Sequence, residues 1–370
     1  MPRPGAGTPR FRSDGAQDRS RAPQKLRELS PAAPRLGRIK ELVDLEPPWV
    51  QVLPANPIQK IFRRGQIGAQ LRLLAVLQGE WTPELEEVRK QLRLVAYDSK
   101  PVGLIQRAQN RDGSWPVPDS GQPVGVARQL ALIGLLENLH ALAMQGGHRS
   151  WPGVRRGIRA MLAHQHEDGR FPLLYHHHAA IGGLLISLGL VRNPSVHRAA
   201  HWIAERQRED GGWLHPHMAG NRKSPPSCIW TTVEVLDFLT RYPTVKIKAG
   251  LRAAGEFLLK HALEPNTTTL LPDPQAWDTL DIGSRGLQLF QGGTLRVLEV
   301  LSRAGFNPSD STFKKLYNWL LEQQLGNGYF PRVIGRDPEG DALVTVRVLQ
   351  VIRRVETTRP GQPSVKTSGV

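Results

Sequence analysis

The hydrophobic and polar positions of the chain alternate between two kinds of helical segment. One kind is amphipathic and starts with a proline, in two cases after an asparagine suited to cap a helix. The other is apolar on nearly all sides, as from Ile229 to Leu236. Because a helix that is apolar all round is buried on most of its surface, the pattern predicts an inner ring of helices covered by an outer ring. The predicted outer helices begin at Pro83, Pro152, Pro194, Pro243 and Pro308, and the predicted inner helices span about residues 57–78, 123–145, 175–190, 283–304 and 340–355, besides the segment at Ile229.

A short loop motif recurs between these segments, with the form Gln-x-x-[Asp or Asn]-Gly-x-[Trp or Phe]. A degenerate copy falls at His261 and Glu264, and the five starting positions are 42 to 63 residues apart. A period in this range indicates stacked units of two helices each. We therefore expect an all-α protein, an α/α toroid of about six helix pairs over residues 36–355. The four full copies are Gln109, Asp112, Gly113 and Trp115; Gln165, Asp168, Gly169 and Phe171; Gln207, Asp210, Gly211 and Trp213; and Gln324, Asn327, Gly328 and Phe330.

Each position of the motif has a structural reason. A glycine after Asp or Asn lets the chain leave the outer helix at a positive φ, and the Asp or Asn side chain bonds its own backbone. The aromatic residue packs over the end of the outer helix. The glutamine amide both donates and accepts hydrogen bonds, so it is suited to tie the loop to the next helix. The motif therefore predicts the fold and says little about chemistry.

The charge of the chain is concentrated near its N-terminus. The formal net charge is +16, and residues 1–40 hold ten Lys or Arg against three Asp or Glu. We expect residues 1–35 to be a disordered basic tail and residues 356–370 to be a disordered C-terminal tail. The basic tail predicts weak contact with anionic membranes and no specific nucleic acid partner, although its composition also fits a solvated extension.

Composition also bears on the compartment. The chain has one cysteine, which excludes an internal disulfide, and no apolar run approaches the ~20 residues of a membrane span. The N-terminus has no apolar segment of the kind found in secretory signals. These features predict a soluble protein of the cytoplasm, with peripheral membrane contact through the basic tail.

The four loops resemble the QW motifs of the prenyltransferase and squalene oxidase repeat superfamily, which includes squalene cyclases, other class II terpene cyclases and protein prenyltransferase β subunits. The resemblance covers about residues 101–355. It implies an α/α barrel whose large apolar cavity holds polyprenyl chains, with catalytic groups near the starts of the inner helices.

The chain departs from these families in its acidic motifs. It has neither the Asp-x-Asp-Asp motif of class II cyclases nor the Asp-Asp-x-x-Asp motif of class I synthases. The nearest pair is Asp278 and Asp281, whose spacing places both carboxylates on one face of a helix. We take them as candidate catalytic acids, with capping of the following helix as the structural alternative.

Histidines and one cysteine are candidate groups at the starts of inner helices. His176 and His178 are candidate catalytic residues, with His215 and His217 in the next loop. Cys228 is a weak candidate for a zinc ligand, since prenyltransferases use an Asp-x-Cys pair there and Pro226 replaces the aspartate. We expect no metal and no cofactor. The structural alternatives are capping or partly exposed histidines and a buried cysteine.

Several residues of the later inner helices are expected to face the cavity or to pair with each other. Glu234 and Asp237 lie on an otherwise apolar helix, and pairing with basic residues is the favoured interpretation. The candidate partners, for these acids or for a diphosphate, are Arg285, Arg296 and Arg347. The predicted substrate-binding residues are Trp230, Trp277, Phe290 and Arg285.

The function predicted from the resemblance is binding, and in an enzyme transformation, of a hydrophobic isoprenoid-type substrate in the central cavity. Such an enzyme would be a cyclase-like isomerase or a prenyltransferase with non-standard catalytic residues. Two alternatives stay open: a non-catalytic scaffold that binds a lipid or a protein, and a carbohydrate-active enzyme on the same toroid.

Overall fold

All regular elements that the structure describes are helical. The computed structural model describes residues 46–77, 83–117, 123–215, 227–243, 248–261, 280 and 293–358. Within these ranges the only β-type pairings are two isolated bridges, Trp213 with Cys228 and Phe330 with Asp341. The prediction of an all-α fold is confirmed.

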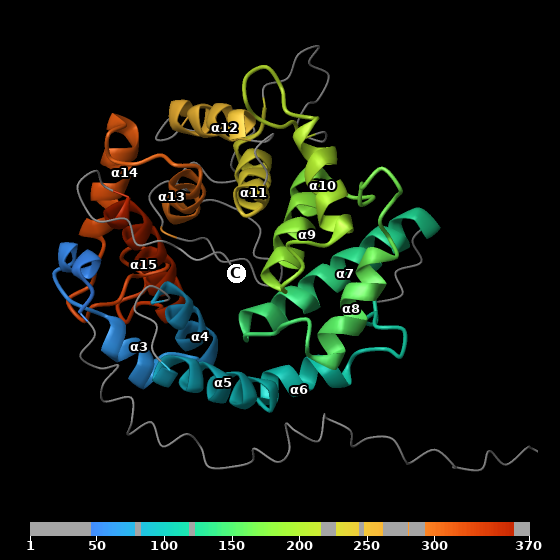
Figure 1. Ribbon diagram of the computed structural model, residues 1–370, viewed down its shortest axis with the longest axis horizontal. Coiled ribbons are helices and arrows are strands. Elements are labelled where there is room, and N and C mark those ends of the chain that lie inside the picture. The colour runs from blue at the N-terminus through green and yellow to red at the C-terminus, as the bar shows by residue number, and fades with distance from the viewer. Residues whose placement is uncertain are drawn as a thin grey trace, which may run out of the picture.

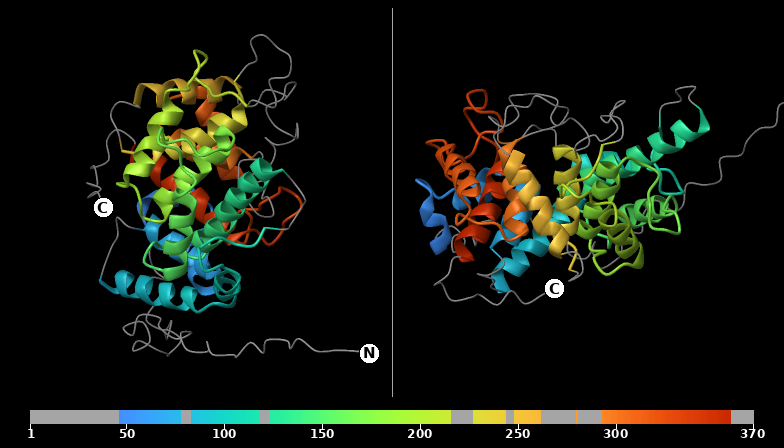
Figure 2. Two further views of the ribbon diagram at one scale, coloured as in Figure 1. Left: turned by 90° about the vertical axis from the view of Figure 1, so that its right-hand side faces the viewer. Right: turned by 90° about the horizontal axis from the view of Figure 1, so that it is seen from above.

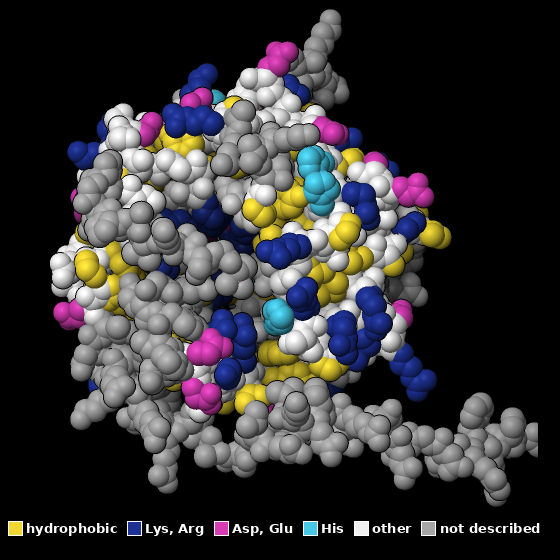
Figure 3. Space-filling view, in the orientation of Figure 1, with side chains coloured by type: hydrophobic (Ala, Val, Ile, Leu, Met, Phe, Trp, Pro, Cys, Tyr) yellow, Lys and Arg dark blue, Asp and Glu magenta, His cyan; other side chains and the backbone are white. Residues whose placement is uncertain are grey.

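The helices form two rings about a common centre (Figure 1), and the space-filling view shows a hollow there (Figure 3). Most neighbouring inner helices pack side by side, and outer helices cover them from outside. The side views in Figure 2 show that the N-terminal part of α7 extends beyond the ring, where Val124 is 87% exposed. The inner helices are α4 (Ile67–Val76), α7 (Val124–Met144), α9 (Tyr175–Ser187), α11 (Ile229–Thr240), α13 (Thr294–Arg303) and α15 (Ala342–Thr357), and the others are η2 (Pro48–Val52), α3 (Ile58–Arg64), α5 (Pro83–Tyr97), α6 (Lys100–Arg107), α8 (Pro152–Leu162), α10 (Pro194–Ala204), α12 (Lys248–His261) and α14 (Ser311–Glu322).

Several helix boundaries differ from the sequence-based prediction: the outer helix from Pro83 is divided into α5 and α6, and α12 is described only from Lys248. Two further differences have a clear cause. The single helix expected over residues 57–78 is two helices, α3 and α4, because Gly65 and Gln66 are both extended. The helix expected to begin at Pro308 begins three residues later, at Ser311. There the carboxylate of Asp310 accepts a hydrogen bond from the Phe313 amide and caps α14. A better capping residue thus overrides the proline signal.

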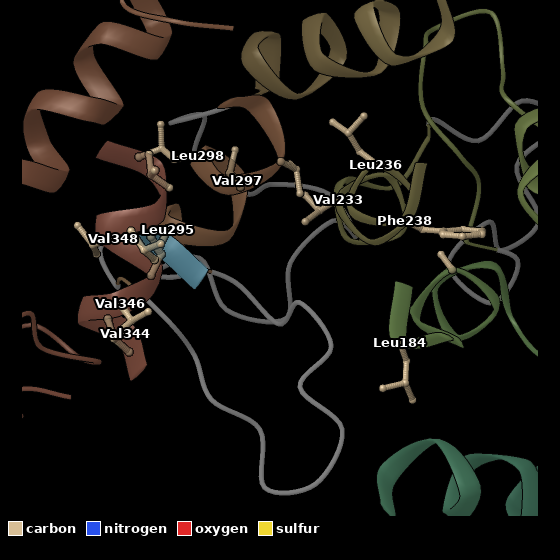
Figure 4. Close-up of a cluster of buried hydrophobic side chains, with 14 of the residues drawn as sticks. Leu184, Val233, Leu236, Phe238, Leu295, Val297, Leu298, Val344, Val346 and Val348 are labelled. Atoms are coloured by element: carbon tan, nitrogen blue, oxygen red, sulfur yellow. The ribbon is translucent and has the colours of Figure 1, made fainter. Parts of the chain in front are cut away.

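Apolar side chains fill the space between neighbouring inner helices (Figure 4). The Phe238 ring of α11 lies directly over α9, where a Cβ added at Gly182 would come within 2.3 Å of it. Glycine at this position therefore lets α9 and α11 approach closely. The described helices include none with the length and apolar character needed to cross a bilayer.

The glutamine of each loop motif joins two units of the ring. Its amide nitrogen donates to the carbonyl of the motif glycine and to a carbonyl just before or in the first turn of the next outer helix, at 2.7 to 2.9 Å in the two later full copies. In the last copy the partner belongs to the beginning of the chain, because Gln324 donates to the Ala55 carbonyl and accepts from the Ala55 amide. One side chain therefore closes the ring between segments 269 residues apart.

The aromatic residue of the motif is fixed to the next inner helix. The backbone amides of Trp213 and Phe330 donate to the hydroxyls of Thr232 and Thr345, which lie in the first turns of α11 and α15. The equivalent amide of Phe171 donates to His178 Nδ1 on α9. These bonds set where each inner helix begins relative to its outer helix.

All four motif glycines have a positive φ, and in the first three copies an added Cβ would also collide with the adjacent outer helix, which it would not do at Gly328. Gly211 has φ +89°, and a Cβ there would lie 2.4 Å from the Ala253 carbonyl oxygen of the adjacent outer helix. Gly305 has φ +93° but has no atom within 4 Å of an added Cβ. The two positions therefore separate the cost of a positive φ from the cost of a backbone collision.

We predict that Gly305→Ala lowers the free energy of unfolding by about 1 kcal/mol, the cost of a positive φ alone. Gly211→Ala adds the collision with the neighbouring helix and is expected to cost a further ~1–3 kcal/mol. Urea unfolding followed by circular dichroism measures both. Equal losses in the two variants would show that the loop is not held tightly against the neighbouring unit.

Candidate functional site

One face of α11 carries polar residues along its whole length. Trp230, Glu234, Asp237 and Arg241 are spaced four, three and four residues apart, so they lie on a single stripe of the helix. Glu234 and Asp237 are both buried. A buried carboxylate is expensive unless it is paired, so this stripe must meet compensating charges on neighbouring elements.

Arginines of α11 and α13 surround Asp237. Arg241 Nη2 lies 2.8 Å from Asp237 Oδ1, Arg296 Nη2 lies 3.1 Å from Oδ2, and Arg303 also pairs with Oδ1. Arg296 Nη2 reaches Glu234 Oε2 as well, at 3.4 Å. The predicted pairing of both acids is confirmed, with Arg296 as the partner that they share.

A second carboxylate centre lies between α13 and α15. Glu299 accepts two parallel hydrogen bonds from Arg347, at 2.9 Å from Nε and 2.7 Å from Nη2. Arg296 Nη1 is 3.7 Å from the same carboxylate and links this pair to the acids of α11. Arg347 therefore pairs with Glu299, which the sequence analysis did not single out, instead of with Glu234 or Asp237.

The charged side chains of several inner helices face a common centre. The pKa of Arg72, on α4, is lowered to about 10 by burial and then by Arg347 and Arg241. The pKa of His140, on α7, is lowered to about 4 by burial and then by Arg72 and Arg296. These groups lie on different inner helices, so their mutual influence means that their side chains converge on the hollow. Figure 3 shows Lys and Arg side chains deep inside this hollow.

We call the arginines and carboxylates that meet in this hollow the central charge network, and it contains more positive than negative charge. Five arginines meet three carboxylates, which leaves two positive charges uncompensated within the network. Arg72 has no carboxylate within salt-bridge distance in the described part of the chain, and its Nη2 contacts Met144 Sδ at 2.7 Å. The network consists of Arg72, Glu234, Asp237, Arg241, Arg296, Glu299, Arg303 and Arg347.

The carboxylates of the network are held in the ionised state. Burial opposes ionisation of Asp237, but Arg241, Arg296 and Arg303 hold its pKa well below the usual range. Burial opposes ionisation of Glu299 too, yet Arg347 and Arg296 lower its pKa to about 2. Neither group is a proton donor at neutral pH. This differs from the acid that a cyclase or a glycosidase requires.

A cluster of rings lies at the N-terminal ends of α9 and α11. The His176 ring stacks on His215, with centroids 5.0 Å apart, and on Trp230, with centroids 4.9 Å apart. His177 lies 4.2 Å from His176, between ring centroids, and burial followed by His215 lowers its pKa to about 4. The predicted candidates His176 and Trp230 thus lie together. We call these four residues the His–Trp cluster.

His178, two residues after His176, has a structural role in the loop that precedes α9. His178 Nδ1 accepts the Phe171 amide, so the proton of its neutral ring belongs on Nε2, which lies 3.0 Å from the Ala199 carbonyl. His178 is fully buried, and burial lowers its pKa to about 4. Both ring nitrogens are bonded to backbone away from His176, and His178 takes the place that threonine has in two other units.

Cys228 occupies the N-cap position of α11 without a capping hydrogen bond from its side chain, and burial raises the pKa of its thiol. Among the residues that the structure describes, no three His, Cys, Asp or Glu side chains are arranged to hold a metal ion. The remaining candidates from the sequence lie outside the described residues: Asp278, Asp281, Trp277, Phe290, Arg285, His217, residues 1–35 and residues 359–370. The first residues of the predicted C-terminal tail are ordered instead, because α15 continues to Thr357 and the buried carboxylate of Glu356 accepts a hydrogen bond from the Tyr317 hydroxyl.

Sequence reasoning missed Arg72, Arg241, Glu299 and Arg303 as parts of the site. A signal was present, because Arg296, Glu299 and Arg303 repeat at three and four residues on α13, as the polar residues of α11 do. A charged stripe on a largely buried helix indicates a shared polar centre more specifically than any one acid does.

The comparisons with known proteins identify no family for this chain, and the likenesses to solved structures are distant. No protein-family model matches the chain, and no curated protein matches it. The type II terpene cyclase MstE from Scytonema is 13% identical with a TM-score of 0.40, over 78% of this chain and 88% of that one. A family 88 glycosyl hydrolase from Bacteroides vulgatus is 9% identical with a TM-score of 0.44, over 78% and 90%. A polysaccharide lyase is 11% identical with a TM-score of 0.44, over 85% and 96%.

We predict that Glu299→Leu lowers the free energy of unfolding by about 3–5 kcal/mol, since it leaves Arg347 buried opposite a methyl group. The double variant with Arg347→Leu is expected to recover most of this loss, because no charge is then left without its partner. The exposed pair Arg252 and Glu256 is the control, where Glu256→Leu costs under about 1 kcal/mol. Additive losses in the double variant would contradict a buried, coupled pair.

A pH dependence follows from the His–Trp cluster. The folded-state pKa of His177 is about 4, below the ordinary value of 6.5. The unfolded chain therefore binds a proton more readily, and the stabilisation present above pH 6.5 is lost as the pH falls toward 4. We expect His177→Gln to flatten this decline by up to about 1.4 kcal/mol per pH unit. Parallel curves for the two proteins between pH 7 and 4.5 would contradict the assignment.

Proposed function

We propose that this toroid binds an isoprenoid-type molecule that carries an anionic head group, with the head group held by the central charge network. The observation that carries the proposal is the excess of arginine at the centre. Planar guanidinium groups bind phosphate and carboxylate oxygens with paired hydrogen bonds, and they do so most strongly where water is excluded.

The charged lining favours an anionic isoprenoid over a neutral hydrocarbon. The sequence predicted a large apolar cavity, but the part of the hollow that the structure describes contains the buried side chains of Asp237, Glu299, Arg296 and their partners. Transferring squalene into such surroundings gains little, because the charged groups would lose water without gaining hydrogen bonds. A diphosphate or carboxylate would instead compensate the unpaired positive charge.

Binding is better supported than catalysis by the described residues. A cyclase needs a carboxylic acid that is protonated before the reaction, and a glycosidase needs one acid in that state as well. Asp237 and Glu299 are held ionised by arginines. The sequence-based candidates Asp278 and Asp281 are therefore the acids that we propose for a catalytic role in an enzyme. For this reason the second candidate function is binding of the isoprenoid without any chemical transformation.

The test compares three ligands that differ in head group. Geranylgeranyl diphosphate is expected to bind at least ~10-fold more tightly than geranylgeraniol, and squalene is expected to give no thermal shift. Arg72→Met removes a cation that has no carboxylate partner in the described residues, so it should weaken diphosphate binding without leaving an acid unpaired. The matched control is Arg63→Met, at an exposed position of α3.

Each outcome of this titration by calorimetry decides between the candidates. Equal affinity for the diphosphate and the alcohol would contradict a role for the arginines. If no isoprenoid binds but an acidic oligosaccharide such as oligogalacturonate does, the carbohydrate-active alternative replaces the proposal. Tight binding without any product after prolonged incubation would identify a binding protein.

A further inference from the structure

A cavity lies beside the central charge network, between the ends of several helices. Its volume is about 280 Å³, and its lining comes from α4, α5, the turn after α7, and the last residues of α9 and α11. We call it the arginine pocket. The charged and titratable residues of the described lining are Arg72, Arg89, Arg93, His148 and Arg241, and the described lining residues include no carboxylate.

Close packing of backbone forms one wall of the arginine pocket. The N-terminal turn of α4 meets the C-terminal end of α7, where a Cβ added at Gly68 would lie 2.2 Å from the Met144 carbonyl oxygen. Gly146 continues the chain at φ +84°, and a Cβ there would lie 2.3 Å from Leu71 Cδ1. These glycines bring the two helix ends together, so the cavity is bounded by the fixed frame of the ring.

The cations of the pocket differ in how well they are compensated. Arg241 pairs with Asp237 and donates to the Ser187 hydroxyl at 3.0 Å, and Arg89 pairs with Glu86 at 2.8 Å. Arg72 and Arg93, by contrast, make no ion pair within the described part of the chain. Positive charge in the pocket therefore exceeds negative charge.

The pKa values of the pocket residues reflect the same excess of positive charge. The pKa of Arg93 is lowered by its partial desolvation and then by Arg89, and the pKa of His148 is lowered by partial desolvation and then by Arg93. Each cation thus makes its neighbour harder to protonate. A bound anion would reverse these shifts, because a negative charge favours the protonated form of every group around it.

We propose that the arginine pocket is a binding site for a phosphoryl group, with Arg72, Arg93 and Arg241 as the groups that contact its oxygens. A tetrahedral phosphoryl group offers several acceptor oxygens to guanidinium groups that approach from α4, α5 and α11, whereas a carboxylate offers two in one plane. This inference rests on the proposed function, because Arg72 and Arg241 also belong to the central charge network. It places the anionic head group of the ligand in the arginine pocket.

The experiment is a calorimetric titration of the full chain with inorganic pyrophosphate. We expect the wild-type protein to bind it and Arg93→Gln to bind it at least tenfold more weakly. The control is Lys90→Gln, which removes an equal charge from an exposed position of the same helix outside the pocket and is expected to leave the affinity unchanged. Because Arg93 is itself exposed, its replacement is not expected to disturb folding.

The outcomes separate the pocket from the proposed function. Absence of pyrophosphate binding, or an equal loss in Arg93→Gln and Lys90→Gln, overturns the pocket. If geranylgeranyl diphosphate binds both the wild type and Arg93→Gln with one affinity, the pocket is wrong while the isoprenoid function stands. If pyrophosphate binding depends on Arg93 but the prenyl chain adds no affinity, the pocket stands and the isoprenoid function fails.

Discussion

The structure depends most on how the ring keeps several arginines close together at its centre. Like charges in a water-poor interior repel, and among the described residues three carboxylates compensate only part of the five guanidinium groups that meet there. The ring resists opening to relieve this repulsion, because its two ends are joined where α15 packs against α4 and where Gln324 bonds Ala55. The covalent and hydrogen-bonded frame thus maintains a positive centre that a ligand can complete.

The same frame explains why the charges point inward. In each unit a glutamine ties its loop to the next outer helix, and in three units a Thr or His in the first turn of an inner helix receives the loop amide. These two bonds fix the rotation of each inner helix about its axis. A polar stripe such as Glu234, Asp237 and Arg241 then faces the hollow in every unit that has one, and the apolar remainder packs between helices (Figure 4).

The fold was predictable from the sequence to a larger degree than the site. The loop motif repeats local contacts, so its spacing alone indicates helix pairs and a ring. The site depends on contacts between helices far apart in the chain, such as Arg347 with Glu299, and these follow from helix rotation. His176 and His178 illustrate this limit: two residues apart on α9, one stacks on Trp230 and the other bonds backbone of the neighbouring unit. The break at Gly65 was missed because glycine also occurs inside helices here, as at Gly182.

The most direct test of a positive centre that needs an anion is a crystal structure with tungstate, a heavy analogue of phosphate, measured at the tungsten absorption edge. The account predicts an anomalous peak within hydrogen-bond distance of the Arg72 and Arg93 guanidinium groups. A hollow without any peak, in which acidic side chains of the chain itself pair with both arginines, would contradict it.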